Sequence, residues 1–374
     1  MKRNLIIISW AAVVAAFSAC GDGPSQEEVP QDTAIMAIPV DTLVALDSIG
    51  VLMGDSCYMF GSIVSAEALP GGGRILLDRN TGLISEYDPN GDFVRSFGGL
   101  GEAPGQFNLP GLMTVLGDGR VAASDWRDRE VLFYSPEREY LGSRPAPGGE
   151  MPMSISAVGD SCFVTYSCPS RQMGSSFRMG YELTVWEGMT EDPVSTPFSH
   201  LFDFGEEEFD FLPGYLTVTG SPGGRIYLHR IASPDYIIEV LDLQGQPVDS
   251  ITCEAASVPY EEIERYTNLP LAYFMVSIDG ESQQISGEVP DFAPQVENLG
   301  IDSLGNIWAR RGTSKEFMWD IHTPEGELAR QAVLVGLPDT SSIRVNINQH
   351  GITAWDRAPE DYPRIYLIGF EEDL

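Results

Sequence analysis

The sequence predicts an all-β fold built from repeated four-stranded units. Short apolar strands that follow a turn recur six times, for example as GGGRILLDR (71–79) and GDGRVAASDW (117–126). A second tight turn comes later in each unit, and 18 residues separate Gly73 from Gly91. β-Branched and aromatic residues between Gly, Asn, Asp and Pro turns are typical of strands. Four-stranded units that repeat at 42 to 46 residues in the regular parts of the chain predict a six-bladed β-propeller.

The N-terminus has the pattern of a bacterial lipoprotein signal peptide. Two basic residues precede a 13-residue apolar stretch (5–17), and small residues then lead to Cys20. The apolar stretch is too short to span a bilayer comfortably. The run Phe17-Ser18-Ala19-Cys20 resembles a lipobox, which implies removal of residues 1–19 and lipid attachment to Cys20. The alternative is an ordinary secretory peptide followed by a coincidental cysteine.

The rest of the chain divides into a tether, a propeller and a short tail. Residues 20–38 are rich in Gly, Pro and acids and too polar to fold alone, so we expect a flexible acidic tether. The propeller is predicted over 39–370, with insertions at about 189–213 and 254–292, and 371–374 form the tail. Together with lipid on Cys20, this predicts an extracytoplasmic protein of the cell envelope, at the periplasm or the outer membrane.

An N-terminal strand is expected to join the C-terminal blade. Residues 40–47 precede a blade-to-blade joint, so they would form the outer strand of a blade. The other three strands of that blade are predicted at 343–347, 352–355 and 364–370. Such pairing closes the ring and leaves no open seam.

The glycine-rich run GGLGEAPGQFNLPG (98–111) raises the possibility of a phosphate loop. No Lys-Ser or Lys-Thr pair follows it, and it leads into a strand and not into a helix. The segment 96–121 also aligns with 48–75, where an outer strand leads to the next inner strand. We therefore predict that this run is a joint between blades.

The charge of the chain excludes some partners. The formal net charge is −33, and removal of Lys2 and Arg3 with the signal peptide makes it −35. Such a chain is a poor nucleic-acid binder, and anionic headgroups repel it. We expect attachment to the membrane through lipid and no nucleic-acid partner.

Four cysteines remain after Cys20. They are scattered along the chain, at Cys57, Cys162, Cys168 and Cys253. An exported protein permits disulfides, and Cys162 with Cys168 is the best candidate pair. Buried free thiols are the alternative, and the spacing does not suggest a zinc site.

A family resemblance is carried by residues 87–143. The run from YDPNGDFVRSFGGLGEAPGQFNLPG through to YLGS resembles consecutive NHL-type repeats, and the mature chain is similar to six-bladed NHL/TolB-like β-propeller lipoproteins of Bacteroidetes-type bacteria. The resemblance implies the fold and the envelope location. It implies little about function, because the fold hosts binding proteins and enzymes alike.

Arginines recur at one level of the predicted propeller. Six residues beyond the turn glycine, in the loop between the second and third strands, four units have arginine: Arg79, Arg230, Arg311 and Arg357. In the second unit Trp126 and Arg127 occupy this loop. A ring of guanidinium groups would suit a carboxylate, a sulfate, an acidic glycan or an acidic peptide.

Each of these interpretations has an architectural alternative. Acids stand next to the arginines or in their place, at Asp78, Asp125 and Asp356, so the arginines could instead form a belt of salt bridges between blades. Trp126 either packs between blades or stacks on a sugar. The acidic, Phe-rich segment 202–214 is either a partner-docking strand or a solvated linker.

The sequence favours a binding or scaffold module for an anionic ligand or a partner protein. The alternative is a calcium-dependent lactonase, esterase or lyase, for which Asp78, Asp125 and Asp356 are weak ligand candidates because arginines compete for them. No nucleophile elbow or three-histidine zinc site is apparent. No catalytic residue is therefore assigned, and calcium is the one cofactor considered.

Overall fold

β-Strands make up nearly all the regular structure, and short 3-10 helices account for the rest. The structure, a computed structural model, describes residues 38–146, 152–173, 176–203, 212–260, 273–278, 281–286, 290–314, 316–337, 343–357, 359 and 361–373. Residues Ile38–Leu374 form one compact unit. Within the described ranges, no helix is long and apolar enough to cross a membrane.

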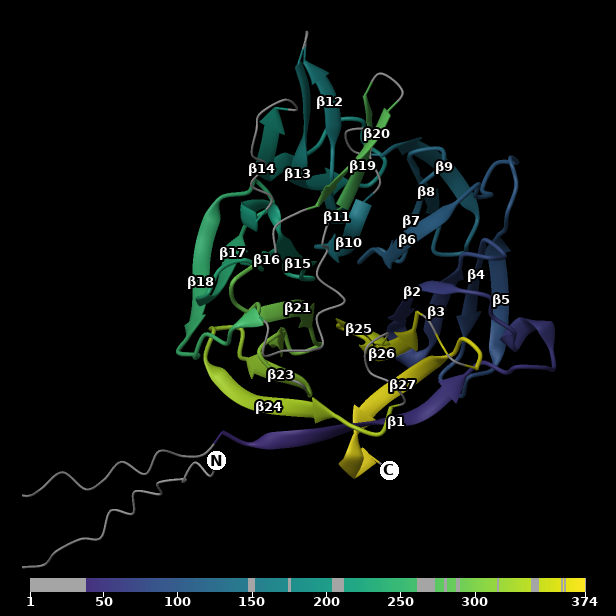
Figure 1. The fold of residues 1–374 in the computed structure, drawn as a ribbon. Coiled ribbons are helices and arrows are strands. Elements are labelled where there is room, and N and C mark those ends of the chain that lie inside the picture. Colours follow the sequence, from purple (N-terminus) through teal and green to yellow (C-terminus); the bar gives the residue numbers. More distant parts are fainter. Residues whose placement is uncertain are drawn as a thin grey trace, which may run out of the picture. The chain divides into compact units, whose positions relative to one another are not determined.

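Four separate sheets follow one another along the chain (Figure 1). The first contains β2 (Ile63–Ala68), β3 (Arg74–Asp78), β4 (Leu83–Tyr87) and β5 (Phe93–Gly98). The second contains β6 (Pro110–Val115), β7 (Val121–Asp125), β8 (Glu130–Tyr134) and β9 (Tyr140–Pro145). The third contains β10 (Pro152–Val158), β11 (Cys162–Ser167), β12 (Ser170–Met173), β13 (Ser176–Glu187) and β14 (Ser195–Asp203). The fourth contains β15 (Leu216–Gly220), β16 (Ile226–Arg230), β17 (Tyr236–Leu241) and β18 (Pro247–Cys253).

The remaining strands form one large sheet and one hairpin. The large sheet has eight strands in the order β21-β22-β23-β24-β1-β27-β26-β25. Its members are β21 (Val296–Ile301), β22 (Ile307–Arg311), β23 (Phe317–His322), β24 (Leu328–Leu334), β1 (Val40–Ile49), β27 (Ile365–Phe370), β26 (Gly351–Asp356) and β25 (Ile343–Asn348). The hairpin pairs β19 (Tyr273–Ile278) with β20 (Glu281–Ser286). The short 3-10 helices are η1 (Ser56–Tyr58), η2 (Pro70–Gly72), η4 (Leu212–Gly214) and η6 (Glu371–Asp373).

The fold is all-β and propeller-like, as the sequence predicts, but the sheets are not six separate ones. β1 pairs antiparallel with β27, which is the pairing expected from the sequence. Its first residues, Val40–Leu43, also pair in parallel with Gln331–Leu334 of β24. β1 therefore merges two four-stranded groups into one sheet, and it covers an edge of β24 that would otherwise be open.

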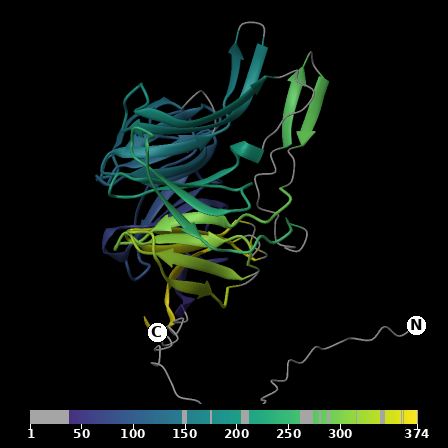
Figure 2. The ribbon, with the colours of Figure 1, turned by 90° about the vertical axis from the view of Figure 1, so that its left-hand side faces the viewer.

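The segment 189–213, expected as an insertion, contributes a strand to its sheet. β14 pairs with β13 along most of its length. The acidic segment 202–214 lies largely outside the described residues, because 204–211 are not described. The segment 254–292 contains the separate β19–β20 hairpin, which projects from the same side of the sheets as the β12–β13 hairpin (Figure 2).

The glycine-rich run 98–111 joins β5 to β6, as predicted. Within it, the Phe107 N–H donates to the Gly99 carbonyl at 2.8 Å, and the Gly101 N–H donates to the Phe107 carbonyl at 2.9 Å. Gly101 has φ 152° and Gly105 has φ 80°, a range that favours glycine. The run is thus a hydrogen-bonded joint whose glycines are required by its backbone path.

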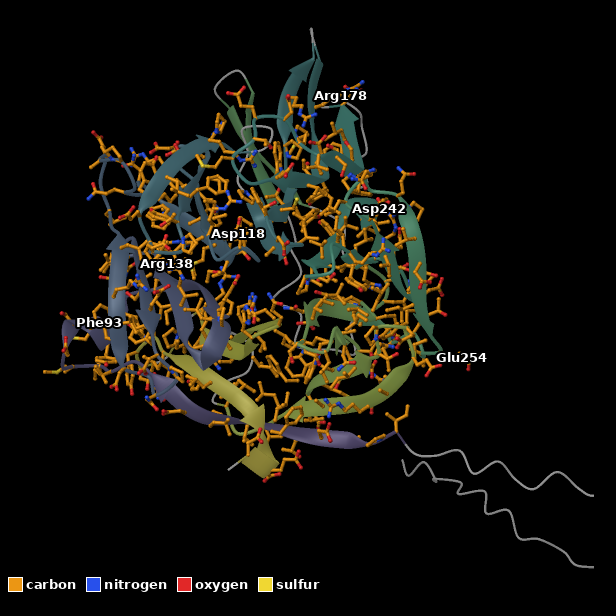
Figure 3. All side chains as sticks on the ribbon, turned by 180° about the vertical axis from the view of Figure 1, so that it is seen from behind. Phe93, Asp118, Arg138, Arg178, Asp242 and Glu254 are labelled. Atoms are coloured by element: carbon orange, nitrogen blue, oxygen red, sulfur yellow. The ribbon has the colours of Figure 1, made fainter. Side chains whose placement is uncertain are left out.

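The hydrophobic core lies between neighbouring sheets. One buried cluster joins Ile75 and Leu77 of the first sheet to Met113 and Leu132 of the second. Polar contacts cross the same boundary: Arg138, in the β8–β9 turn and labelled in Figure 3, donates from Nε to the Glu86 carboxylate at 2.5 Å. Each sheet therefore buries its faces against its neighbours, as packed sheets do.

The candidate disulfide between Cys162 and Cys168, to which buried free thiols were the alternative, is not formed. Cys162 is a free thiol buried in the third sheet, and Cys57 and Cys253 are free thiols as well. Burial raises the pKa of the Cys162 thiol. Packing as a small apolar side chain accounts for Cys162 without a covalent role.

The first strand of each group lies at the end of its sheet and next to the first strand of the following group. The contacts run β2, β6, β10, β15, β21, β25 and back to β2. Each of these inner strands therefore has one edge without a ladder partner. Polar side chains hydrogen-bond across five of these six boundaries, through Ser65, Glu67, Thr114, Ser156, Asn298 and Asn348.

Glu67 is the one acid among these cross-strand side chains. Its Oε2 accepts the Val115 N–H of the next inner strand at 3.1 Å. Its pKa is raised to about 7, because burial penalises the charged form more than the Val115 N–H and the Thr114 hydroxyl favour it. Ionisation of Glu67 therefore opposes folding, since the unfolded chain binds its proton less tightly.

Truncation of the Leu43 side chain in the N-terminal strand β1 should destabilise the fold strongly. Leu43 is fully buried between β24 and β27, so Leu43→Ala should cost about 2–5 kcal/mol of unfolding free energy. Leu46→Ala is the matched control, because Leu46 is 40% exposed on the same strand and should cost less than about 1 kcal/mol. Urea denaturation measures both. Equal losses would contradict the role given to the Leu43 side chain.

The raised pKa of Glu67 predicts a pH-dependent difference between the wild-type chain and Glu67→Gln. The folded-state pKa of about 7 lies above the ordinary glutamate pKa of 4.5, so the wild type loses stability as pH rises between these values. Glu67→Gln keeps an acceptor for the Val115 N–H and removes the charge. The variant should gain stability relative to wild type across this range, by about 3 kcal/mol at pH 8 compared with pH 4. Denaturant titrations at both pH values test this, and a constant difference would refute it.

Candidate functional site

A cavity of about 830 Å³ lies among the inner strands. Side chains of β2, β6, β10, β15, β21 and β25 line it. Because the inner strands begin at the level of the loops between second and third strands, those loops border one end of the cavity, which we call the mouth. The turns after the inner strands, such as 349–350, border the opposite end, which we call the floor. The cavity thus extends along the inner strands from mouth to floor.

Arg79 and Arg357 lie at the mouth, where the sequence predicts them. Arg79 follows β3 and Arg357 follows β26, and both line the cavity. The Arg79 Nε donates to the Pro110 carbonyl at 3.3 Å, so this edge of the guanidinium is already bound. Burial lowers the pKa of Arg79, and the nearby positive charge of Arg357 lowers it further. Two like charges therefore share one end of the cavity.

Trp126 holds Arg79 in place. Trp126 follows β7 and lines the cavity, and the Arg79 guanidinium lies over its ring at 4.8 Å from the centroid. The indole packs against Gly111, where a Cβ atom would overlap it. The ring thus packs within the protein and also lines the cavity, and the cation–π contact orients the Arg79 guanidinium.

Arg344 is a third cationic side chain of the cavity, and it was not a sequence candidate. It lies at the start of β25, where an inner strand reaches the mouth. Burial and the positive charges of Arg357 and Arg310 together lower its pKa to about 10, although the Glu297 carboxylate acts in the opposite direction. Arg344 could have been predicted at the mouth, because it lies near the start of the predicted strand 343–347 and inner strands begin at this face.

The structure does not bring Arg230, Arg311 or Arg127 to the cavity. The Arg230 Nε pairs with Glu239 of the third strand of its sheet at 2.8 Å. The Arg311 Nε pairs in the same way with Asp320 at 2.7 Å. Arg127 is exposed and does not line the cavity. The predicted ring of arginines is thus a cluster on one part of the mouth, and the two salt bridges lie within sheets and not between them.

Asp78 and Asp125 bind backbone amides. The Asp78 carboxylate accepts the N–H groups of Gly61 and Ser62 at 2.9 and 3.0 Å. The Asp125 carboxylate likewise accepts the Leu109 N–H at 3.2 Å. These amides belong to the joints that enter each sheet, so the two carboxylates anchor the joints to the second strands.

The sequence suggested that arginines would compete with calcium for these carboxylates. In the structure, backbone amides occupy the carboxylates of Asp78 and Asp125 instead. Neither Asp78 nor Asp125 lines the cavity, and nor does Asp356, which is buried at the end of β26. Over the described ranges, no three His, Cys, Asp or Glu side chains form a group that could hold a metal ion.

Glu67 lines the cavity toward its floor, three residues along β2 from Val64 at the mouth. Sequence reasoning missed it, because alternation along one strand does not show which side chain faces the axis of the sheets. His350, in the β25–β26 turn, lines the same end. Burial lowers the pKa of His350 and so favours its neutral ring. The cavity therefore has cations at the mouth and an ionisable carboxyl toward the floor.

Comparisons with solved structures support the fold. A protein of Bacteroides fragilis that is described as exported shares it, with a TM-score of 0.50 and 12% identity over 89% of this chain and 99% of that chain. A member of the DUF4221 family from Bacteroides vulgatus has a TM-score of 0.45 and 11% identity over 88% of this chain and 98% of that chain. Virginiamycin B lyase from Staphylococcus aureus has a TM-score of 0.43 and 10% identity over 87% and 98%.

Sequence comparisons do not place the chain in a family. No protein-family model matches it. No curated protein matches it either. The chain shares an all-β, propeller-like fold with the Bacteroides fragilis protein that is described as exported, and its function rests on its own residues.

Proposed function

We propose that the chain is a six-bladed β-propeller that binds a small anion at the mouth of its central cavity. Arg79 and Arg357 would bind the anion directly, and Arg344 would add positive charge beside them. The observation that carries the proposal is the shared position of these guanidinium groups in one cavity. Arginine is suited to carboxylate, sulfate and phosphate groups, because its planar fork offers paired donors.

The surroundings of Arg79 and Arg357 support binding over a structural salt bridge. Neither guanidinium forms an ion pair with a carboxylate of the described residues. Arg79 is partly buried, oriented by Trp126 and Pro110, and repelled by Arg357. An anion between the two side chains would relieve this repulsion. In a chain with a net charge of −33, cations placed in this way support a binding role.

Six blades follow if the eight-stranded sheet counts as two. Its strands β21–β24 form one antiparallel group, and β25–β27 with β1 form another. The parallel pairing of β1 with β24 joins the two groups along four residue pairs. The two groups and the four separate sheets make six blades, which agrees with six inner strands in cyclic contact.

We also propose that lipid on Cys20 anchors the propeller outside the cytoplasm. The support is the N-terminal pattern of basic residues, apolar stretch and Phe17-Ser18-Ala19-Cys20. The polar segment 20–38 would then link the anchor to β1. Several acyl chains on one residue give stable attachment, whereas a single chain is marginal.

Removal of the two directly binding arginines should weaken anion binding. The double variant Arg79→Gln and Arg357→Gln loses two charge-assisted contacts, so its affinity for inorganic sulfate should fall at least about tenfold. Titration of the intrinsic fluorescence reports binding, because Trp126 and Trp355 line the cavity. Arg127→Gln is the control, since Arg127 lies outside the cavity and its loss should leave the affinity unchanged. Equal affinity of the wild type and the double variant would refute the proposal.

Replacement of Cys20 should release the protein from membranes. In a bacterial host that processes lipoproteins, the wild type should sediment with the membrane fraction, and Cys20→Ser should move to the soluble fraction of the envelope. Cys57→Ser serves as the control, because Cys57 belongs to the folded unit and should not affect sedimentation. Continued sedimentation of Cys20→Ser with membranes would contradict lipid anchoring.

A further inference from the structure

The side chains that bridge the inner strands are neutral, with one exception. Ser65, Thr114, Ser156, Asn298 and Asn348 each form such a bridge with a hydroxyl or an amide group. Glu67 uses a carboxyl for the same purpose, although a neutral amide would also accept the Val115 N–H. A buried carboxyl costs free energy when it ionises, so its presence at this position requires a reason beyond architecture.

The reason lies in the cavity that Glu67 shares with the arginine cluster. Resting on the proposed function, we infer that Glu67 couples anion binding to proton uptake: the site takes a small anion when the Glu67 carboxyl is protonated and loses affinity when it is ionised. The proton comes from solvent and binds to the Glu67 carboxylate as the anion enters. Glu67 does not contact the anion. Its charge state changes the electrostatic potential in the cavity and thereby the affinity for the anion.

The distance between the two ends makes the coupling measurable. Three residues of β2 separate Glu67 from the mouth, which corresponds to about 10 Å at the rise of a strand. At that distance, in surroundings less polarisable than water, one negative charge should weaken binding of an anion about tenfold. Ionisation occurs near neutral pH, because the pKa of Glu67 is about 7.

Other charged groups around Glu67 do not provide an equivalent switch. The elements packed against β2 contribute Arg74 and Asp78 from β3, Arg344 from β25, Asp356 from β26 and His350 from the intervening turn, whereas β6 contributes none. Burial is the largest cause of the raised pKa of Glu67, and the Val115 N–H and the Thr114 hydroxyl lower that pKa. The Arg74 guanidinium donates to the carbonyls of Gly72 and Gly73.

Two of these groups set the pH range for a test. Burial lowers the pKa of His350 below its ordinary value near 6.5, so His350 is mostly neutral above pH 6.5. Arg344, with a pKa of about 10, stays charged below pH 8. Between pH 6.5 and 8, Glu67 is therefore the group facing the cavity from these elements that changes its charge.

Calorimetric titration with sodium sulfate tests the coupling, because sulfate keeps its charge over this range. The wild-type affinity should fall about fourfold from pH 6.5 to 8 at constant ionic strength. Titrations at pH 7.5 in two buffers of different ionisation enthalpy should show uptake of about half a proton per sulfate. Glu67→Gln should bind sulfate with nearly the same affinity at both pH values and without proton uptake. Glu182→Gln, which removes a buried carboxylate outside the cavity, should behave as the wild type.

Each outcome separates the inference from the proposed function. If the wild-type affinity does not change with pH, or if Glu67→Gln keeps the wild-type pH dependence, the inference is wrong while sulfate binding through the arginines stands. If the wild type does not bind sulfate at either pH, the proposed function and the inference both fall. If Glu67→Gln does not fold, the proton count on the wild type decides, and a count of zero overturns the inference.

Discussion

The open edge of the innermost strands is the constraint on which the structure depends. The six inner strands β2, β6, β10, β15, β21 and β25 each have a ladder partner on one side only. Their six open edges meet around the cavity. Unpaired backbone groups that are shielded from water cost free energy, and ladders cannot form between blades that radiate from one axis. Side chains from the adjacent inner strand therefore supply the missing hydrogen bonds. The mainly apolar inner wall of the cavity therefore carries polar side chains where the inner strands meet, before any ligand is considered.

The outermost strands also have an open edge, although solvent can reach it. At one place β1 covers such an edge, that of β24. The first half of β1 pairs with β24, and the second half pairs with β27. The chain thus uses one strand to complete its last group and to cover the outer edge of the preceding group. Asp41 adds an ion pair to Arg330 at 3.2 Å across this junction. As a consequence, the two groups no longer have separate outer edges and form one eight-stranded sheet.

Local sequence patterns predicted the strands and part of the site, because turns and strand periodicity are local. The position six residues beyond the turn glycine placed Arg79 and Arg357 at the mouth. The same position also selected Arg230 and Arg311, which pair with acids nine residues later on the third strand. Arg357 is followed at that spacing by Tyr366, and Arg79 by Asp88, which lies beyond the end of β4. An acid nine residues later could therefore have identified the paired arginines from the sequence. Arg344 and Glu67 could not be identified in this way, because the sequence does not show which inner-strand side chains face the cavity.

The acidity of the whole chain limits what the arginines can bind. A surface with a net charge of −33 repels anions, but salt screens this repulsion beyond about 10 Å at an ionic strength of 0.1 M. An anion inside the cavity would interact mainly with the guanidinium groups at the mouth, and its interactions with the partly buried Arg79 and Arg344 would be stronger than in water. A long acidic polymer would gain the same contacts at one end, and its other charges would lie against the acidic exterior. The balance of charges therefore favours a compact anion that the cavity encloses over an extended polyanion.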